Sequence, residues 1–579
     1  MSTLRRSTAA LVAAAIVLTG ACSSGSTAPS APQPVLGLSV TAISSSSIRV
    51  TFSGRVGESY EIERAAGAAG TYALVTTITT LTADGTQTYN DVGLTVTSLY
   101  RYRVTSVKGT QKSTPTIETS TTTLAFGSAS ADIVTDIAVS RTLFADTAYT
   151  LRGFIHVANG ATLTIQPGTT IKGDFNTLGS MLMVLRGARI QAVGTASSPI
   201  VFTSSRAAGS RQTGDWGGLV IVGNAPVNRS GTVNIEGSGT DGTAIVGGKN
   251  YSVQYNGGTV ATDNSGTLSY VRVEFAGYAP LQDNEFNAFT FAGVGNGTRA
   301  SYLQALAGLD DSFEFFGGGF DLDHLVALET GDDMFDMSEG FNGRIQFAIG
   351  MNTVQLTPRT GAGSFATDLQ GIENDGCNGT GCDLGFDTAP FTLPLVANFT
   401  LIGCGQASCV GAGGGYGMML RRGTGGYYVN GVVTRFPTGG TSLRDVATFT
   451  RAGSTATPTV DANLQVRNVL YAETNSVMFQ AASATQNVLD ATANNLTLST
   501  ATAASLFTTL PAVAAAPASI TAFDFSPVAG SAIATGGLAT FTGGLSTKAG
   551  TFVTGTAYLG AVAPGGVKWW QGWTFYGRN

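Results

Sequence analysis

Charged residues and histidines are scarce in this sequence. Asp, Glu, Lys and Arg together make up 12% of the 579 residues, and there are two histidines and five cysteines. Disordered chains carry more charge and less apolar content than the 43% found here, so a disordered protein is excluded. The net charge of −6 does not provide the basic surface that phosphate groups require, so no nucleic-acid partner is expected.

Familiar catalytic motifs are also missing. The sequence contains no convincing Ser-His-Asp motif, P-loop or dinucleotide-binding fingerprint. The glycine run at residues 411–417, GAGGGYG, lacks the Lys-Ser/Thr pair and the following helix of a phosphate loop, so it is interpreted as turn backbone. His324 follows Asp323, which could orient an imidazole, but a structural histidine is the favoured interpretation. No catalytic residue is therefore assigned.

Helical periodicity is absent over any useful length beyond residue 125, whereas glycine is abundant, with 77 residues. Short apolar runs separated by glycine-rich segments are typical of β-strands joined by turns. The sequence therefore predicts an all-β protein. Its length allows several domains or one very elongated domain.

The N-terminus has the features of a targeting segment. Arg5 and Arg6 precede an apolar run at residues 9–18, which is too short to span a membrane and is typical of a signal peptide. The following LTGAC resembles the bacterial lipobox, in which the cysteine is lipidated after cleavage. The resemblance implies a signal peptide at 1–21, a lipid anchor on Cys22 and, because Ser23 follows, a surface-exposed outer-membrane lipoprotein. An ordinary secretion signal is the alternative.

Residues 22–33 are rich in Ser, Ala and Pro and are interpreted as a flexible tether behind the lipidated cysteine. Residues 34–124 then alternate apolar and polar positions in the manner of half-buried strands. Leu94, Tyr100 and Tyr102 resemble the tyrosine-corner pattern of fibronectin type III domains. The resemblance implies a β-sandwich and no chemistry. A spacer between membrane and main domain is favoured over a dedicated binding module.

The four remaining cysteines form two close pairs. Disulfides are expected because an exported chain meets an oxidising compartment. Local pairs that each close a short loop are favoured among the three possible pairings, and a zinc site built from all four thiolates is the alternative. The predicted disulfide residues are Cys377, Cys382, Cys404 and Cys409.

From position 125 to the end, short strand-like runs recur at a spacing typical of solenoid repeats. The run at 158–165 is echoed at 185–192, and the run at 199–204 is followed by a similar one at 218–223. Each repeat is too small to form a hydrophobic core by itself. This indicates a solenoid, in which neighbouring turns bury one another's apolar side chains. The series Asn398, Asn430, Asn468 and Asn495, each close to a strand, fits left-handed backbone bends in a parallel β-helix.

Several segments in order resemble one group of secreted bacterial β-helix proteins. They are GATLTIQPGTTIKG, PIVFTS, GDWGGLVIVGNAP, SGTLSYVRVEFAG and DDSFEFFGG. The fold of this group is like that of pectate lyases, so the resemblance implies a long right-handed parallel β-helix at 125–579 and supplies no activity. The aromatic end, with Trp569, Trp570 and Trp573, is expected to cap the open end of the coil, with sugar stacking as the alternative.

Two acidic segments share one pattern: LDDSFEFFGG at 309–318 and GDDMFDMSEG at 331–340. If the offset between them is one turn of the coil, Phe313 stacks on Phe335 inside it, and the neighbouring acids point outward. The paired acids are then Asp310 with Asp332, Asp311 with Asp333, and Glu314 with Asp336.

Stacked carboxylates about 5 Å apart repel one another by roughly 3 kcal/mol at an effective dielectric of about 20. Protonation, hydrogen bonds or a bound cation can relieve this repulsion. Calcium, which prefers oxygen ligands, is the favoured cation in an exported protein. The predicted calcium ligands are Asp310, Glu314, Asp332 and Asp336; Glu373 and Asp375 are candidates for extending the wall. A metal-free solvated or turn-capping wall and a set of catalytic carboxylates are the alternatives.

These observations favour a non-catalytic, lipid-anchored surface protein whose β-helix binds an extracellular polymer or glycan, with calcium as a candidate cofactor and no organic cofactor. A polysaccharide lyase or glycoside hydrolase on the same fold is the first alternative. For this alternative the base candidates are Arg272, Arg344, Arg421 and Arg422. A structural or adhesion protein is the second alternative. An arginine or lysine near the acids across a groove would favour the enzyme.

Overall fold

The structure, a computed structural model, describes residues 31–125, 129–238, 252–281, 284–366, 368–378, 382–411, 413–452, 464–481, 489–515, 517 and 519–577. The signal peptide and Cys22 therefore lie outside the described residues. No helix in the described ranges is long and apolar enough to cross a membrane. The chain divides into two compact units, Met1–Ala125 and Phe126–Asn579.

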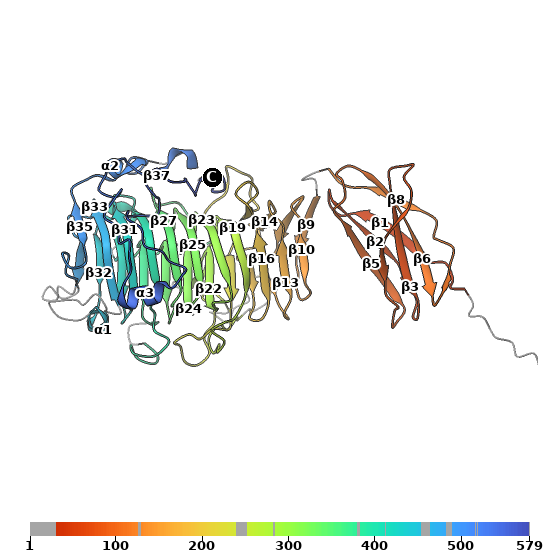
Figure 1. The fold of residues 1–579 in the computed structure, drawn as a ribbon, viewed down its shortest axis with the longest axis horizontal. Helices are drawn as coiled ribbons and strands as arrows, with labels where there is room; N and C mark the ends of the chain where they lie inside the picture. The colour runs from red at the N-terminus through yellow and green to blue at the C-terminus, as the bar shows by residue number, and fades with distance from the viewer. Residues whose placement is uncertain are drawn as a thin grey trace, which may run out of the picture. The chain divides into compact units, whose positions relative to one another are not determined.

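The first unit consists of two antiparallel sheets (Figure 1). One contains β1 (Leu36–Ala42), β2 (Ser47–Gly54) and β5 (Gly85–Val92); the other contains β4 (Ala73–Ile78), β3 (Ser59–Ala66), β6 (Leu99–Lys108), β7 (Gln111–Lys112) and β8 (Thr119–Thr122). Their alternating apolar residues form one core, in which the rings of Phe52 and Tyr60 lie 5.0 Å apart. The Tyr100 hydroxyl accepts a hydrogen bond from the backbone N–H of Thr95 at 2.9 Å, which ties β6 to the preceding loop.

The second unit is a parallel β-helix, as the sequence predicts. Its ten-stranded sheet contains β12 (Phe154–Val157), β15 (Met181–Val184), β18 (Gly218–Val222), β22 (Phe289–Val294), β24 (Phe313–Gly318), β26 (Phe335–Ser338), β28 (Ile372–Asp375), β30 (Tyr416–Arg421), β32 (Gly439–Leu443) and β34 (Phe479–Ala481). We call it the short-strand sheet. Every neighbouring pair in it is parallel, and each strand belongs to a different turn of the coil.

The remaining faces of the coil form a fifteen-stranded sheet, the long-strand sheet. It contains β9 (Ala129–Ile133), β10 (Arg141–Leu143), β11 (Thr147–Leu151), β13 (Thr162–Ile165), β14 (Thr170–Gly173), β16 (Arg189–Val193), β17 (Ile200–Ser204), β19 (Gly266–Glu274), β23 (Arg299–Leu306), β25 (Asp321–Leu328), β27 (Arg344–Met351), β29 (Leu395–Ile402), β31 (Gly426–Thr434), β33 (Leu464–Ala472) and β35 (Leu496–Ser499). The first half of β19 pairs with β16 and its second half with β17. The two faces of the coil to which β16 and β17 belong are therefore both continued by the single strand β19.

Each long strand from β19 to β33 bends at one residue with left-handed backbone geometry, and the matching residue of β35 immediately precedes that strand. Tyr270 in β19 has φ 50°, and Tyr302 in β23 has φ 53° at the matching register. The predicted asparagine series lies on this bend, with φ 55°, 58°, 53° and 52° at Asn398, Asn430, Asn468 and Asn495. Asparagine tolerates this region better than most residues because its short polar side chain bonds locally. The asparagine positions thus mark the corners of the coil.

Two of the three predicted repeat spacings correspond to one turn. Thr162, in the run at 158–165, pairs with Arg189 in its echo, and the offset between the acidic segments pairs Glu314 with Asp336. The third spacing is wrong as a turn, because 199–204 contributes β17 to the long-strand sheet whereas 218–223 contributes β18 to the short-strand sheet. That spacing measures the step from one face to another.

The segment after β35 folds back along the coil. It contains α2 (Ala503–Leu506), β36 (Phe507–Thr509), β37 (Asp524–Pro527) and α3 (Gly543–Ala549). Figure 1 shows α2, β37 and the C-terminus along one flank. The Trp573 ring packs edge-on against Tyr270, and Arg272 Nη1 donates to the Trp573 carbonyl at 3.0 Å. Tyr270 and Arg272 belong to β19, an interior strand of the sheet. The aromatic tail therefore covers the flank, not the open end that the sequence predicts, because its rings meet an aromatic row on that wall.

Candidate cation-binding cleft

Three acidic residues occupy the same position on successive turns of the short-strand sheet. Glu314 on β24 pairs with Asp336 on β26, which pairs with Glu373 on β28. The preceding residues Phe313 and Phe335 are buried inside the coil, with ring centroids 5.5 Å apart. Because side chains alternate along a strand, the three carboxylates lie on the outer face. The pairing predicted from the repeated acidic pattern is therefore present, and Glu373 extends it by one turn.

Asp311 and Asp333 form a second group just before the strands, and they bond to backbone. The Asp311 Oδ1 atom accepts the Asp333 backbone N–H at 2.8 Å, and Asp333 in turn accepts the N–H of Gln370. These two side chains tie one turn to the next, which is the turn-capping role that the sequence left open. Asp310, by contrast, is 8% exposed, and its carboxylate accepts no hydrogen bond from the residues that the structure describes.

The acids line a cleft of about 690 Å³, which we call the acidic cleft. Its ten carboxylates are Glu236, Glu285, Asp310, Asp311, Glu314, Asp332, Asp336, Asp368, Glu373 and Asp375. The four predicted calcium ligands are all among them. Glu236, Glu285 and Asp368 are not identified by the sequence, because they come from segments outside the repeating strands of the coil, where no repeat fixes their position. Arg421 and Arg422 are the basic residues that line this cleft.

Three triads of carboxylates have the spacing of a cation site, and all their members except Asp333 line the cleft. In each triad one oxygen per residue lies within 4.8 Å of the others: Asp310, Asp311 and Asp332; Asp311, Glu314 and Asp336; Asp333, Asp336 and Glu373. The Oδ1 atoms of Asp332 and Asp336 are buried and have no hydrogen-bond partner within the described ranges. Buried polar atoms are normally paired. A donor set made only of carboxylate oxygens fits a hard cation such as calcium, so the residues present are suited to it.

Burial and mutual repulsion make the fully ionised cluster unfavourable. Burial, followed by the charge of Asp332, raises the pKa of Asp310 well above its ordinary range, and the pKa values of Glu314 and Glu373 are raised by burial and by neighbouring carboxylates. Burial and the charge of Asp375 raise the pKa of Asp336 to about 7. A divalent cation would supply the charge that is missing and favour the ionised forms.

The two arginines at one end of the cleft form ion pairs with acidic residues. Arg421 Nε donates to Asp375 Oδ1 at 2.7 Å and the guanidinium also pairs with Glu373, while Arg422 pairs with Asp375. Burial opposes the charge of Arg421, but Glu373 and Asp375 outweigh it and hold the pKa of this guanidinium above its ordinary value. A group held in its protonated form is poorly suited to act as a base. It is suited to binding an anionic ligand.

The other two base candidates lie elsewhere. Arg272 pairs with Glu274, and Arg344 pairs with Asp321, all on the long-strand sheet. Neither arginine lines the acidic cleft. His324, the histidine singled out in the sequence, is also on the long-strand sheet, where its ring stacks on Tyr302 at 4.3 Å. The structural interpretation of His324 fits this packing.

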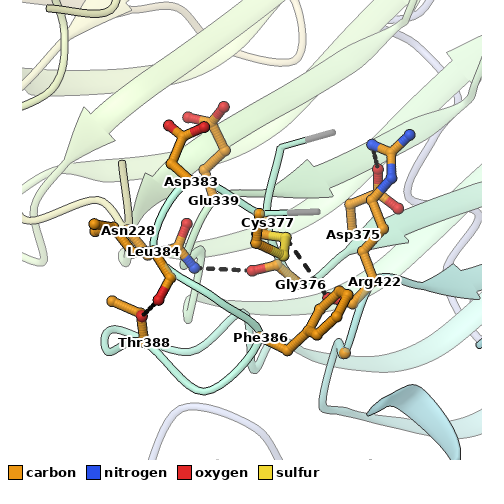
Figure 2. Close-up of a disulfide and its surroundings, with 12 residues drawn as sticks. Asn228, Glu339, Asp375, Gly376, Cys377, Asp383, Leu384, Phe386, Thr388 and Arg422 are labelled. Carbon is orange, nitrogen blue, oxygen red and sulfur yellow. Dashed lines mark hydrogen bonds and ion pairs between the residues drawn. A yellow bond between two sulfur atoms is a disulfide. The ribbon is translucent and has the colours of Figure 1, made fainter. Parts of the chain in front are cut away.

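A disulfide closes the loop beside the cleft. Cys377, which follows Asp375 and Gly376, is joined to Cys382, and Asn228 Nδ2 donates to the carbonyl of Gly376 at 2.8 Å (Figure 2). The second disulfide joins Cys404 and Cys409. Each cysteine pair thus closes its own loop, and the alternative of four zinc-binding thiolates is wrong because all four sulfurs are used in disulfides. The first disulfide limits the movement of the chain that carries Asp375.

Family comparison agrees with this architecture. Residues 135–512 match the family described as the pectate-lyase-like β-helix domain. This match spans more than half of the chain. The chain therefore belongs to the pectate-lyase-like β-helix family. No curated protein matches it in sequence.

Three solved structures are similar to parts of the chain. A family 28 exopolygalacturonase from Yersinia enterocolitica is 10% identical, covers 78% of this chain and 82% of its own, and has a TM-score of 0.16. A pectate lyase from Erwinia chrysanthemi in complex with tetragalacturonic acid is 11% identical, with 59% and 86% covered and a TM-score of 0.13. A fourth fibronectin type III domain from human is 20% identical, with 18% and 90% covered and a TM-score of 0.15.

Proposed function

We propose that the acidic cleft binds calcium and, through it, an acidic polysaccharide. The observation that carries this proposal is the set of three carboxylate triads with buried, unpartnered oxygens of Asp332 and Asp336 in the part of the chain that the structure describes. Calcium takes six to eight oxygen ligands, so carboxylates of a polymer can complete a shell that the protein fills only in part. Arg421 and Arg422 supply positive charge at one end for a further carboxylate of the same polymer.

The polymer is proposed to be acidic for an electrostatic reason. An acidic chain would be repelled by the carboxylates of the cleft without calcium, whereas its own carboxylates are the oxygen ligands that bound calcium prefers. Binding should therefore require both partners together. The family membership supports a polysaccharide-related role, and the tetragalacturonic acid bound to the similar pectate lyase supplies a practical probe.

The test uses the full chain with Cys22→Ser, which removes the proposed lipid. Tetragalacturonate should bind at least tenfold more tightly in calcium than in EDTA when measured by titration calorimetry, and a neutral cello-oligosaccharide should bind in neither. Equal binding in calcium and EDTA would refute the proposal. The variant Asp336→Asn, which removes a charge shared by two triads, should need a calcium concentration about tenfold higher to bind the same probe.

Polysaccharide cleavage is the second candidate. The cleft arginines lie near the acids, but Arg421 is held in its protonated form, so a pair of carboxyl groups would have to carry the chemistry. Adjacent-turn carboxyls such as Glu314 and Asp336 also have a separation compatible with the pair used by retaining glycosidases. The same incubation, followed for ultraviolet absorbance of unsaturated sugars and for new reducing ends, decides between binding and cleavage. Product of either kind would replace the non-catalytic proposal.

We further propose that the protein is anchored in the outer membrane through lipid on Cys22, with the N-terminal unit as a fibronectin type III-like spacer. The lipobox and the Tyr100 hydrogen bond to Thr95 support these two parts. Metabolic labelling with radioactive palmitate should mark the unchanged chain. The Cys22→Ser variant should remain unlabelled and leave the membrane fraction. Labelling of that variant would sink the proposed anchor.

A further inference from the structure

A second cavity lies on a different part of the coil. It has a volume of about 530 Å³, within the range of small-molecule sites. Its walls come from connections that follow strands of the short-strand sheet, from the first residues of β25, β27 and β31 in the long-strand sheet, and from α3 in the C-terminal segment. Its lining residues are Asn296, Gly319, Asp321, Asn342, Gly343, Arg344, Leu393, Tyr427, Gly544, Thr547 and Lys548. We call it the side pocket.

The side pocket carries one uncompensated positive charge. Arg344 binds Asp321 through two hydrogen bonds, at 2.7 and 2.6 Å, so these two charges cancel. Lys548 Nζ donates to the backbone carbonyl of Asn342, and it forms no ion pair with any residue that the structure describes. A partly buried ammonium that lacks a carboxylate partner favours an anionic ligand. A ligand with a single negative charge would therefore balance the charge of the side pocket.

The shape and chemistry of the walls favour a sugar. Two glycines let polar side chains lie close against the wall: a Cβ at Gly319 would lie 1.9 Å from Asn342 Oδ1, and one at Gly544 would lie 2.7 Å from the Tyr427 hydroxyl. Asn296 and Asn342 are exposed and offer amide donors and acceptors at the rim. A ligand with several hydroxyls and one carboxylate matches both the amides and the lysine.

We propose that the side pocket binds one acidic sugar residue, a uronate, with its carboxylate on Lys548 and its hydroxyls on the asparagine amides. This site uses no cation, so it does not rest on the proposed function of the acidic cleft. On one polymer, the two sites would act as separate contacts. Two linked contacts on one chain raise overall affinity without new interactions at either site.

In the experiment, the Cys22→Ser full chain is titrated with sodium glucuronate in EDTA, which removes calcium and so prevents calcium-dependent binding. Glucuronate should bind, and glucose should not. Lys548→Met should weaken glucuronate binding at least tenfold, whereas Lys548→Arg should retain most of it. Lys172→Met, a lysine on β14 outside the pocket, is the matched control and should bind like the unchanged chain.

A pH profile tests the same site without a substitution. Burial and the charge of Arg344 lower the pKa of Lys548 to about 8. The groups that face it are Arg344, Asp321 and the Tyr427 hydroxyl. Glucuronate stays ionised as the lysine loses its proton, so its affinity should fall as the pH rises through this pKa. Absence of glucuronate binding in EDTA, unchanged affinity in Lys548→Met, or a flat pH profile would each overturn the proposal, whatever the acidic cleft does.

Discussion

Replacing Asp336 with asparagine should make the protein more stable than the unchanged chain in EDTA and should reduce the stabilisation that calcium adds. Asp336 belongs to two of the three carboxylate triads, and its Oδ1 atom is buried without a hydrogen-bond partner in the described ranges. Without a cation its charge is repelled by the neighbouring carboxylates. With a cation the same charge becomes a ligand.

The two effects have opposite signs and comparable sizes. Removal of one charge about 5 Å from a like charge relieves roughly 3 kcal/mol of repulsion at an effective dielectric of about 20. Calcium at roughly 1,000 times its dissociation constant stabilises the folded state by about 4.1 kcal/mol, and a tenfold loss of affinity removes about 1.4 kcal/mol of that. The stability advantage of Asp336→Asn over the unchanged chain should therefore shrink from roughly 3 kcal/mol in EDTA to about 1.6 kcal/mol in calcium.

Thermal unfolding in EDTA and in calcium, followed by circular dichroism, measures how far calcium narrows this stability difference. Asp368→Asn is the matched control, because Asp368 lines the same cleft but belongs to none of the triads. It should relieve repulsion in EDTA without lowering the calcium-induced rise in melting temperature by more than about a degree. If calcium shifts the unchanged chain and Asp336→Asn equally, Asp336 is not a ligand. If calcium shifts neither, the cleft is a metal-free acidic wall.

The regular part of the cleft was predictable because it obeys the period of the coil. Once the offset between the two acidic segments is taken as one turn, strand alternation places Phe313 inside and Glu314 outside, and both statements hold. The left-handed bends were predictable at the asparagines for the same reason. Tyr270 and His324 occupy the same bend but carry no composition signal for it.

The irregular parts could not be predicted from periodicity. Glu236 lies in the long connection between β18 and β19, and Glu285 lies on β21 (Asn284–Phe286), which pairs with β20 (Tyr278–Leu281) outside the coil. Neither segment repeats, so no register brings it to the cleft. The predicted location of the aromatic tail was wrong for a related reason. Its composition indicates that it is buried, but its location depends on the row of Tyr270 and Tyr302 on the flank, against which Trp573 packs.

The interior stack next to the cleft should be the most sensitive point of the coil to a single substitution. Phe313 is fully buried, and its ring lies 5.0 Å from Phe289 and 5.5 Å from Phe335 on the two adjacent turns. Phe313→Ala should destabilise the coil by about 3–5 kcal/mol, because it removes apolar contacts and leaves a cavity. Phe313→Leu keeps most of the volume and should cost about 1.5 kcal/mol or less.

Urea unfolding of the Cys22→Ser chain measures these differences. Phe391→Ala is the surface control: its ring is 38% exposed beneath the Arg451 guanidinium, so its loss should cost about 1 kcal/mol or less. Each turn of a solenoid is stabilised mainly by its two neighbours, so a cavity between turns weakens both contacts at once. Phe313→Ala should therefore also weaken calcium binding, because Glu314 and Asp336 lie on the two turns between which the cavity forms. A loss below about 1 kcal/mol would mean that the phenylalanines do not hold these turns in register.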